Sequence, residues 1–104
     1  MPQWHDLTAV TDLPPSGMLS VPIAGRKPAI LILHLDDDWY AVDDRCSHED
    51  YPLSIGCIHH GMLKCSLHGS RFDLRTGQPL DEPATDPIRT YPVRVEDGRV
   101  WVEW

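Results

Sequence analysis

No window of the chain repeats its apolar residues with the period of about 3.6 that an ordinary helix requires. The chain contains 10 prolines, and proline interrupts helix interiors. Apolar residues instead form short segments, several of which alternate with polar residues as half-buried strands do. The predicted strands are Met18–Ile23, Ile30–Leu35, Trp39–Val42, Met62–Cys65, Tyr91–Val95 and Val100–Trp104. Turn residues separate them, at 14–17, 36–38, 60–61, 76–77 and 96–98. The pattern predicts an all-β fold, an antiparallel sandwich or barrel.

The length of 104 residues predicts a single domain, 1–104, with one modest core. The formal net charge is -7 and the longest basic run is Arg26-Lys27, which argues against nucleic acid or an anionic membrane as the main partner. The longest apolar run, 29–33, is far shorter than the ~20 residues of a membrane span, and the N-terminus does not resemble a signal peptide. We therefore expect a soluble, cytoplasmic monomer whose protein partners carry basic surfaces.

Residues of about 45–78 break the strand pattern and are predicted to form an insertion that carries a binding site. All three cysteines and four of the six histidines lie in it. Three cysteines cannot all pair within one chain, which argues against a disulfide framework. The order is Cys46-Ser47-His48, then 16 residues (49–64), then Cys65-Ser66-Leu67-His68. Each of two short loops thus offers one thiolate and one imidazole.

Thiolate and imidazole donors select zinc or iron-sulfur chemistry over Mg²⁺ and Ca²⁺, which prefer oxygen. In a Cys2His2 zinc finger the two cysteines precede the two histidines, whereas here cysteine and histidine alternate. A Cys-x-His loop facing a Cys-x-x-His loop suits a two-iron cluster, with both thiolates on one iron and both imidazoles on the other. We expect Cys46, His48, Cys65 and His68 to be these ligands, with a structural zinc site as the alternative. Gly69 would let backbone amides approach the cluster.

Two segments, Cys46-Ser47-His48-Glu49-Asp50 and Cys65-Ser66-Leu67-His68-Gly69-Ser70-Arg71-Phe72-Asp73, resemble the Rieske-type ferredoxins of bacterial aromatic-ring-hydroxylating dioxygenases. The resemblance covers nearly the whole chain, including residues 4–7, 39–42 and 73–77. Within this family, the chain resembles the ferredoxins of carbazole or biphenyl dioxygenases. It implies a Rieske fold, in which a small antiparallel β-sandwich base bears an inserted two-loop subdomain at about 45–78. The resemblance also implies one [2Fe-2S] cluster at the exposed tip of that subdomain.

The family resemblance implies an electron carrier rather than an enzyme. Such a ferredoxin takes single electrons from a flavin-dependent NAD(P)H reductase and passes them to a terminal Rieske oxygenase in aromatic hydrocarbon catabolism. Two alternatives stay open at this point: the Rieske small subunit of an assimilatory nitrite reductase, and a non-redox zinc-binding interaction module.

The resemblance also bears on the reduction potential. High-potential members of the family carry a disulfide between the ligand loops, at positions held here by Tyr51 and Leu67. They also carry a serine and a tyrosine whose hydroxyls bond to cluster or ligand sulfur; Ser70 matches the first, but Phe72 replaces the second. These departures predict a potential near the bottom of the Rieske range of about -150 to +300 mV. For the third cysteine, Cys57, we expect an inert, partly buried thiol, and we expect His59 and His60 to be solvated residues of a hairpin.

Overall fold

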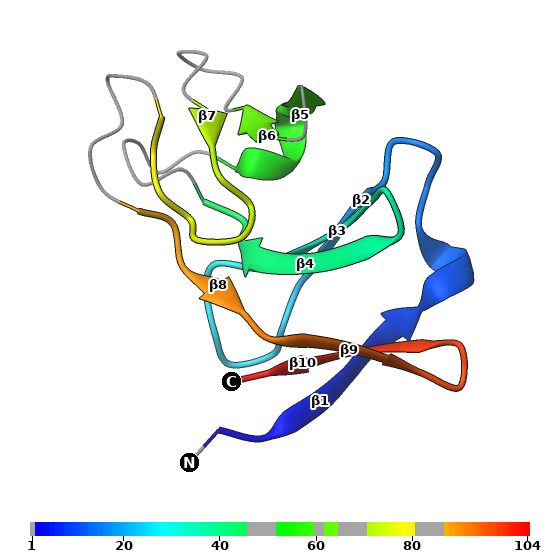
Figure 1. Ribbon diagram of the computed structural model, residues 1–104. Helices are drawn as coiled ribbons and strands as arrows, with labels where there is room; N and C mark the ends of the chain where they lie inside the picture. The colour runs from blue at the N-terminus through cyan, green and yellow to red at the C-terminus, as the bar shows by residue number, and fades with distance from the viewer. Residues whose placement is uncertain (1, 46–51, 60–61, 65–70, 81–86) are drawn as a thin grey trace.

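The computed structural model describes residues 2–45, 52–59, 62–64, 71–80 and 87–104, without the side chains of 55 and 59. In this part of the chain, short strands and two single 3₁₀ turns make up the regular structure (Figure 1). The elements are β1 (Trp4–Ala9), η1 (Val10–Asp12), β2 (Met18–Val21), β3 (Ile30–Leu35), β4 (Asp38–Asp43), η2 (Leu53–Ile55), β5 (Cys57–His59), β6 (Met62–Lys64), β7 (Arg71–Phe72), β8 (Thr90–Tyr91), β9 (Val93–Glu96) and β10 (Arg99–Glu103). The predicted all-β class is confirmed. No helix among these residues is long and apolar enough to cross a membrane.

The strands form three antiparallel sheets stacked as layers in Figure 1. The terminal sheet has the order β1-β10-β9, the central sheet β2-β3-β4-β8 and the small sheet β5-β6-β7. The chain ends meet beside the terminal sheet, where the backbones of Gln3 and Trp104 exchange two hydrogen bonds of 2.7 and 3.1 Å. The terminal and central sheets form the predicted sandwich base, and the small sheet belongs to the predicted insertion.

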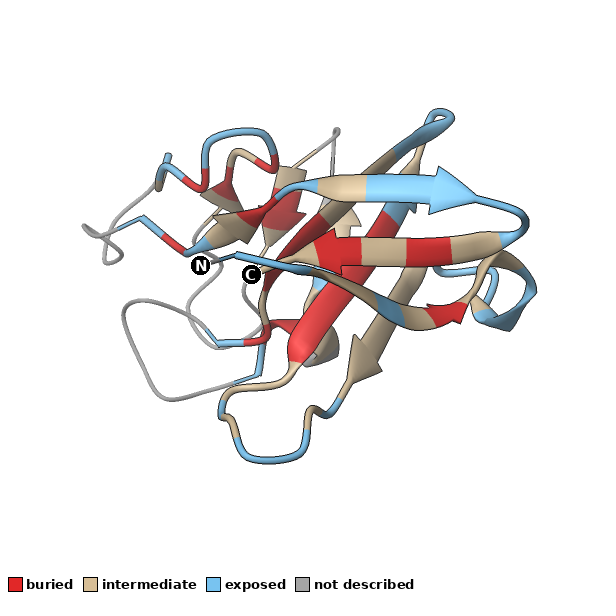
Figure 2. Ribbon diagram, turned by 90° about the horizontal axis from the view of Figure 1, so that it is seen from below, coloured by how far each residue is buried: buried red, intermediate tan, exposed pale blue. Residues whose placement is uncertain are grey.

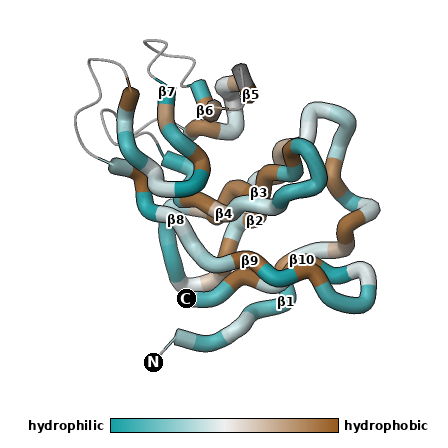
Figure 3. The backbone as a smooth tube through the Cα atoms, in the orientation of Figure 1, coloured by the Kyte–Doolittle hydropathy of each residue, from teal (hydrophilic) through white to brown (hydrophobic). Residues whose placement is uncertain are grey.

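The central sheet is covered on both faces, which explains the unbroken apolar run at the start of β3. Ile30 and Ile32 pack toward the terminal sheet, in a cluster with Val100 and Val102 of β10. The alternate residues of β3 face the other way and pack, in a second cluster, against residues of the insertion; this cluster comprises Leu31, Leu33, Val42, Leu53, Leu63, Phe72, Leu74 and Ile88. Figures 2 and 3 show buried and apolar positions following these strands. A strand buried on both faces needs apolar residues at every position.

The β3–β4 hairpin matches its predicted position closely. Leu35 pairs with Asp38, leaving Asp36 and Asp37 as a two-residue turn with φ of 50° and 67°. Two left-handed residues at the centre of such a turn match the right-handed twist of the flanking strands. The Asp36–Asp38 segment is therefore a hairpin tip, as predicted.

Several strand predictions are corrected by the structure. The expected strand Tyr91–Val95 is two strands in different sheets, because Pro92 lies between β8 and β9 and cannot donate to a ladder. β1, β5 and β7 lay outside the predicted strands altogether. β5 and β7 have only 3 and 2 residues, too few to display an alternating pattern.

A polar network joins the central sheet to the chain between β2 and β3. The Tyr91 hydroxyl donates to Oδ1 of Asp43, and Nη2 of Arg26 donates to the Tyr91 oxygen at 2.8 Å and to Asp43 Oδ1 at 3.3 Å. Burial of the hydroxyl, with the Asp43 carboxylate beside it, raises the pKa of Tyr91 above its usual 10.0, although the Arg26 guanidinium opposes this. The fold therefore favours the neutral phenol.

Replacing Tyr91 with phenylalanine should lower the free energy of unfolding at neutral pH. It should also make that free energy fall less steeply as the pH rises above about 10. A raised folded-state pKa contributes stability that is present below pH about 10 and is lost as pH rises through the raised value. We expect Tyr91→Phe to cost about 1–3 kcal/mol near pH 7, the scale of hydrogen bonds to charged groups, and less than that above pH about 10. Urea unfolding between pH 8 and 11 measures this, with Tyr40→Phe as the control. An equal loss at every pH would contradict the interpretation.

Candidate metal centre

The predicted ligands Cys46, His48, Cys65 and His68 lie outside the described residues, as do Gly69 and Ser70. The described residues do include the backbone on either side of both ligand-bearing segments. We call residues 45–52 the first ligand loop and residues 65–70 the second ligand loop. The described residues at the ends of these loops show how the two ends of each loop are held.

The first ligand loop leaves β4 through Asp44 and returns to the fold at η2. Asp44 is buried, with 8% of its surface exposed, and its N–H donates to the Ala29 carbonyl at 2.8 Å. Its Oδ1 accepts the backbone N–H of Ser54 at 2.7 Å, and its Oδ2 accepts the Ser20 hydroxyl at 2.6 Å. One carboxylate thus connects the residue before the first ligand loop to the helical turn after it.

The second ligand loop joins the antiparallel strands β6 and β7. Lys64, the last residue of β6, pairs with Arg71, the first residue of β7, across the loop's base. The next pair, Leu63 and Phe72, is fully buried in the core. The second ligand loop is therefore closed by a sheet ladder and anchored by apolar burial. The Phe72 ring contributes to this packing.

The supports of the two loops touch each other at Gly56. A Cβ built on this glycine would lie 2.0 Å from the carbonyl oxygen of Lys64, so only glycine allows this approach. The Gly56 N–H donates to the Leu53 carbonyl at 2.9 Å, which closes η2. Cys57, the next residue, pairs with Lys64 in the small sheet. The segment that ends the first ligand loop therefore lies directly against the residue that begins the second.

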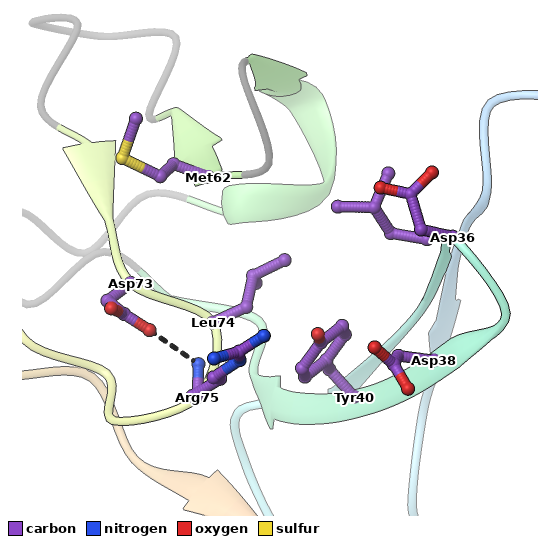
Figure 4. Close-up of a pocket in the computed structure, with 8 residues that line it drawn as sticks. Asp36, Asp38, Tyr40, Met62, Asp73, Leu74 and Arg75 are labelled. Atoms are coloured by element: carbon purple, nitrogen blue, oxygen red, sulfur yellow. Dashed lines mark hydrogen bonds between the residues drawn. The ribbon is translucent and has the colours of Figure 1, made fainter.

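A turn at 73–78 follows β7 and fixes the far side of the insertion. The Gly77 N–H donates to the Asp73 carbonyl at 2.7 Å, and the Gly77 carbonyl accepts the N–H of Ile88 at 2.8 Å. Asp73 Oδ1 accepts the N–H of Arg75 at 2.8 Å, drawn as a dashed line in Figure 4. The predicted turn at 76–77 is confirmed, and it ties the insertion to the chain entering β8.

A groove of about 240 Å³ opens between this turn and the β3–β4 hairpin (Figure 4). It is lined by Leu35, Asp36, Asp38, Tyr40, Met62, Asp73, Leu74 and Arg75. Three carboxylates and one guanidinium make the lining acidic, in keeping with the charge of -7 for the whole chain. Met62 belongs to β6, so this acidic groove lies next to a strand that supports the second ligand loop.

Among the described residues, no group of three or more His, Cys, Asp or Glu side chains is arranged to hold a metal. The third cysteine, Cys57, is a free thiol and is exposed, so its predicted partial burial is wrong. It lies in β5, on the outer side of the small sheet's β5-β6-β7 order, where a side chain can face solvent. His59 pairs with Met62 beside the two-residue connection 60–61, and His60 lies outside the described residues.

Residues 3–92 match the model of the Rieske [2Fe-2S] domain family. The chain belongs to this family. The prediction of a Rieske [2Fe-2S] cluster as cofactor is thereby confirmed. The donor set fits it as well, since two thiolates and two imidazoles are what a Rieske centre requires and the supports of the two loops adjoin at Gly56.

Relatives of this Rieske protein are named as dioxygenase ferredoxin subunits. The 3-phenylpropionate/cinnamic acid dioxygenase ferredoxin subunit of Photorhabdus laumondii is 43% identical over 94 residues, covering 89% of this chain and 87% of the relative. The anthranilate 1,2-dioxygenase ferredoxin subunit of Burkholderia cepacia is 38% identical over 100 residues, with 96% and 91% covered. These names favour the ferredoxin interpretation over a nitrite reductase subunit, and the family's cluster disfavours a zinc module.

The fold of this Rieske protein matches a chain in a solved complex of reduced oxygenase and oxidised ferredoxin in carbazole 1,9a-dioxygenase. The TM-score is 0.86 at 30% identity, with 95% of this chain and 91% of that chain covered. The predicted Rieske fold is confirmed.

Sequence reasoning predicts the donor motif, which lies outside the described residues, and it missed two residues that support the ligand loops, Asp44 and Gly56. In the sequence, nothing distinguishes Asp44 from the other acidic residues of the chain. Its role follows only from its burial and from its hydrogen bond to Ser54. A glycine nine residues before a predicted ligand is a weak signal unless the approach of Lys64 is known.

Proposed function

We propose that this chain is a soluble, cytoplasmic ferredoxin that carries one electron at a time between two protein partners and catalyses no reaction alone. The electron donor would be a flavin-dependent NAD(P)H reductase, and the acceptor the Rieske centre of a terminal aromatic-ring-hydroxylating oxygenase. The observation that carries the proposal is the match, over about nine tenths of the chain, to proteins named as dioxygenase ferredoxin subunits. The solved complex of a similar ferredoxin fold with an oxygenase supports the acceptor.

In this proposal Cys46 and Cys65 hold one iron, and His48 and His68 hold the other. When bound, a [2Fe-2S] cluster supplies a one-electron couple. With two neutral imidazoles and two thiolates, the centre is neutral when both irons are ferric and carries one negative charge after reduction. An all-cysteine set would start two charges lower, so this donor set makes electron uptake easier. The chain's contribution is to hold both donor pairs on adjoining backbone, through the Gly56–Lys64 contact.

The charge of the chain supports recognition of basic partners. The formal net charge is -7, and the acidic groove beside β6 places three carboxylates near the supports of the second ligand loop. Charges of one sign on a carrier speed its encounter with partners of the opposite sign, and dissolved salt screens this attraction.

Stopped-flow electron transfer tests the proposed function. The holoprotein should be reduced by NAD(P)H through a flavin ferredoxin reductase. The reduced holoprotein should then be reoxidised by a terminal oxygenase whose own Rieske centre is oxidised. Both second-order rate constants should fall about tenfold or more between about 20 and 500 mM salt, because the Debye length shrinks several-fold over this range. A holoprotein that exchanges electrons with neither partner would overturn the proposed function. Rates that do not change with salt would contradict the role of charge.

A further inference from the structure

Asp44 is a buried acidic residue at the base of the first ligand loop. Thr8 and Asp44 are the buried polar or charged residues of the described part of the chain, and Asp44 precedes Cys46 by two positions. A buried carboxylate is costly unless its oxygens are satisfied by donors. The burial of Asp44 is therefore not explained by the acidic composition of the chain alone, and its hydrogen-bond partners indicate a specific role.

Both carboxylate oxygens of Asp44 are used, and they connect different parts of the fold. Oδ2 accepts the Ser20 hydroxyl of β2 at 2.6 Å, and Oδ1 accepts the Ser54 N–H of η2 at 2.7 Å. The Asp44 N–H also bonds to the Ala29 carbonyl at 2.8 Å. Within the described part of the chain, no lysine, arginine or histidine forms an ion pair with this carboxylate. The described partners of its carboxylate, the Ser20 hydroxyl and the Ser54 N–H, are neutral donors.

The bond to Ser54 spans the whole of the first ligand loop. Residues 45–53 lie between its two ends, and such a segment could reach roughly 30 Å if extended. The bond instead brings its ends into hydrogen-bond contact. Hydrogen bonds to a charged acceptor are stronger than neutral ones, so this closure is a firm one.

The same closure fixes the first ligand loop relative to the second. Ser54 lies in η2, and η2 is closed by the bond from Gly56 to Leu53. Gly56 in turn lies against the carbonyl of Lys64, next to Cys65 in the sequence. Asp44, Ser54, Gly56 and Lys64 thus form a continuous chain of contacts from the base of one ligand loop to the base of the other.

We propose that Asp44 is a positioning residue for the cluster: its carboxylate closes the first ligand loop and so sets the separation of the two donor pairs. This inference rests on the proposed cluster site and goes beyond it, because it assigns a role to a residue that binds no metal. Loss of the closure should make the cluster easier to remove and its surroundings less uniform. A merely structural carboxylate would affect unfolding and leave the cluster unchanged.

The test compares Asp44→Ala and Asp44→Asn in the holoprotein. Asparagine keeps an oxygen for the Ser54 N–H and an amide for Ser20, but makes the bonds neutral. We expect iron loss to a ferrous chelator to be tenfold faster or more in Asp44→Ala and about threefold faster in Asp44→Asn. The electron paramagnetic resonance spectrum of the reduced protein should broaden in the same order.

Two controls separate positioning from general stability. Val100→Ala removes buried carbon from β10 in the core cluster shared by the terminal and central sheets, and should leave both iron loss and the spectrum unchanged. Ser20→Ala cuts the other Asp44 bond while leaving the closure, and should change iron loss less than twofold. Wild-type iron loss in Asp44→Asn, or equally fast loss in Val100→Ala, would overturn the inference even if Asp44→Ala does not fold. A wild-type protein without a cluster would instead overturn the proposed function.

Discussion

A serine in place of Cys65 is expected to yield colourless protein, with iron and acid-labile sulfide below about a tenth of the wild-type content. The serine hydroxyl stays protonated near neutral pH and is a hard oxygen donor, whereas cluster iron is held by soft thiolates. Loss of one thiolate leaves an iron with three ligands and opens the cluster to water. Absorption spectroscopy, iron analysis and sulfide analysis of anaerobically purified protein measure the outcome.

Cys57→Ser is the matched control for this experiment. Cys57 lies eight residues before the predicted ligand Cys65, and it is an exposed free thiol of β5. Its replacement removes one sulfur from the same insertion and should leave colour, iron and sulfide unchanged. A full cluster in Cys65→Ser, or an empty site in Cys57→Ser, would contradict the assigned ligand set. Far-UV circular dichroism shows whether each variant keeps its sheets.

The sequence predicted those elements whose pattern is local. β3 and β4 are long enough to show their alternation and apolar run, and their predicted ranges agree with the structure to within one residue. The turn at Asp36 and Asp37 was predictable because aspartate tolerates the left-handed conformation. β5 and β7 were missed because strands of 3 and 2 residues owe their existence to partners in β6 rather than to their own composition.

The same distinction holds for the metal centre. Cysteine and histidine are common metal ligands, and their alternating order in residues 46–68 favoured a Rieske centre over a zinc finger. Asp44 bonds to Ser20, which is far away in the sequence, and Gly56 leaves room for the Lys64 carbonyl where a side chain would collide with it. Neither role can be predicted from the residue type alone. Sequence reasoning therefore predicted the cofactor, which the family match confirms, and missed the residues that support the ligand loops.

Gly77 and Gly98 provide a matched pair for testing how firmly the insertion is tied to the sandwich base. Both have left-handed backbones, with φ of +78° and +73°. A Cβ on Gly98 would meet nothing within 4 Å, whereas one on Gly77 would lie 2.1 Å from the carbonyl oxygen of Ile88. The two alanine variants therefore share the cost of a left-handed side chain and differ only in the collision.

We expect Gly98→Ala to lower the free energy of unfolding by about 1 kcal/mol, the cost of a left-handed alanine. Gly77→Ala should lower it by about 3 kcal/mol or more, because the segment at Ile88 must move and the hydrogen bond from its N–H to the Gly77 carbonyl is strained. For a domain of this size the difference corresponds to roughly 10 °C in melting temperature, which thermal unfolding followed by circular dichroism resolves. If both variants lose the same free energy of unfolding, the backbone at Ile88 moves aside at no cost. The turn at 73–78 would then not hold the insertion against the sandwich base.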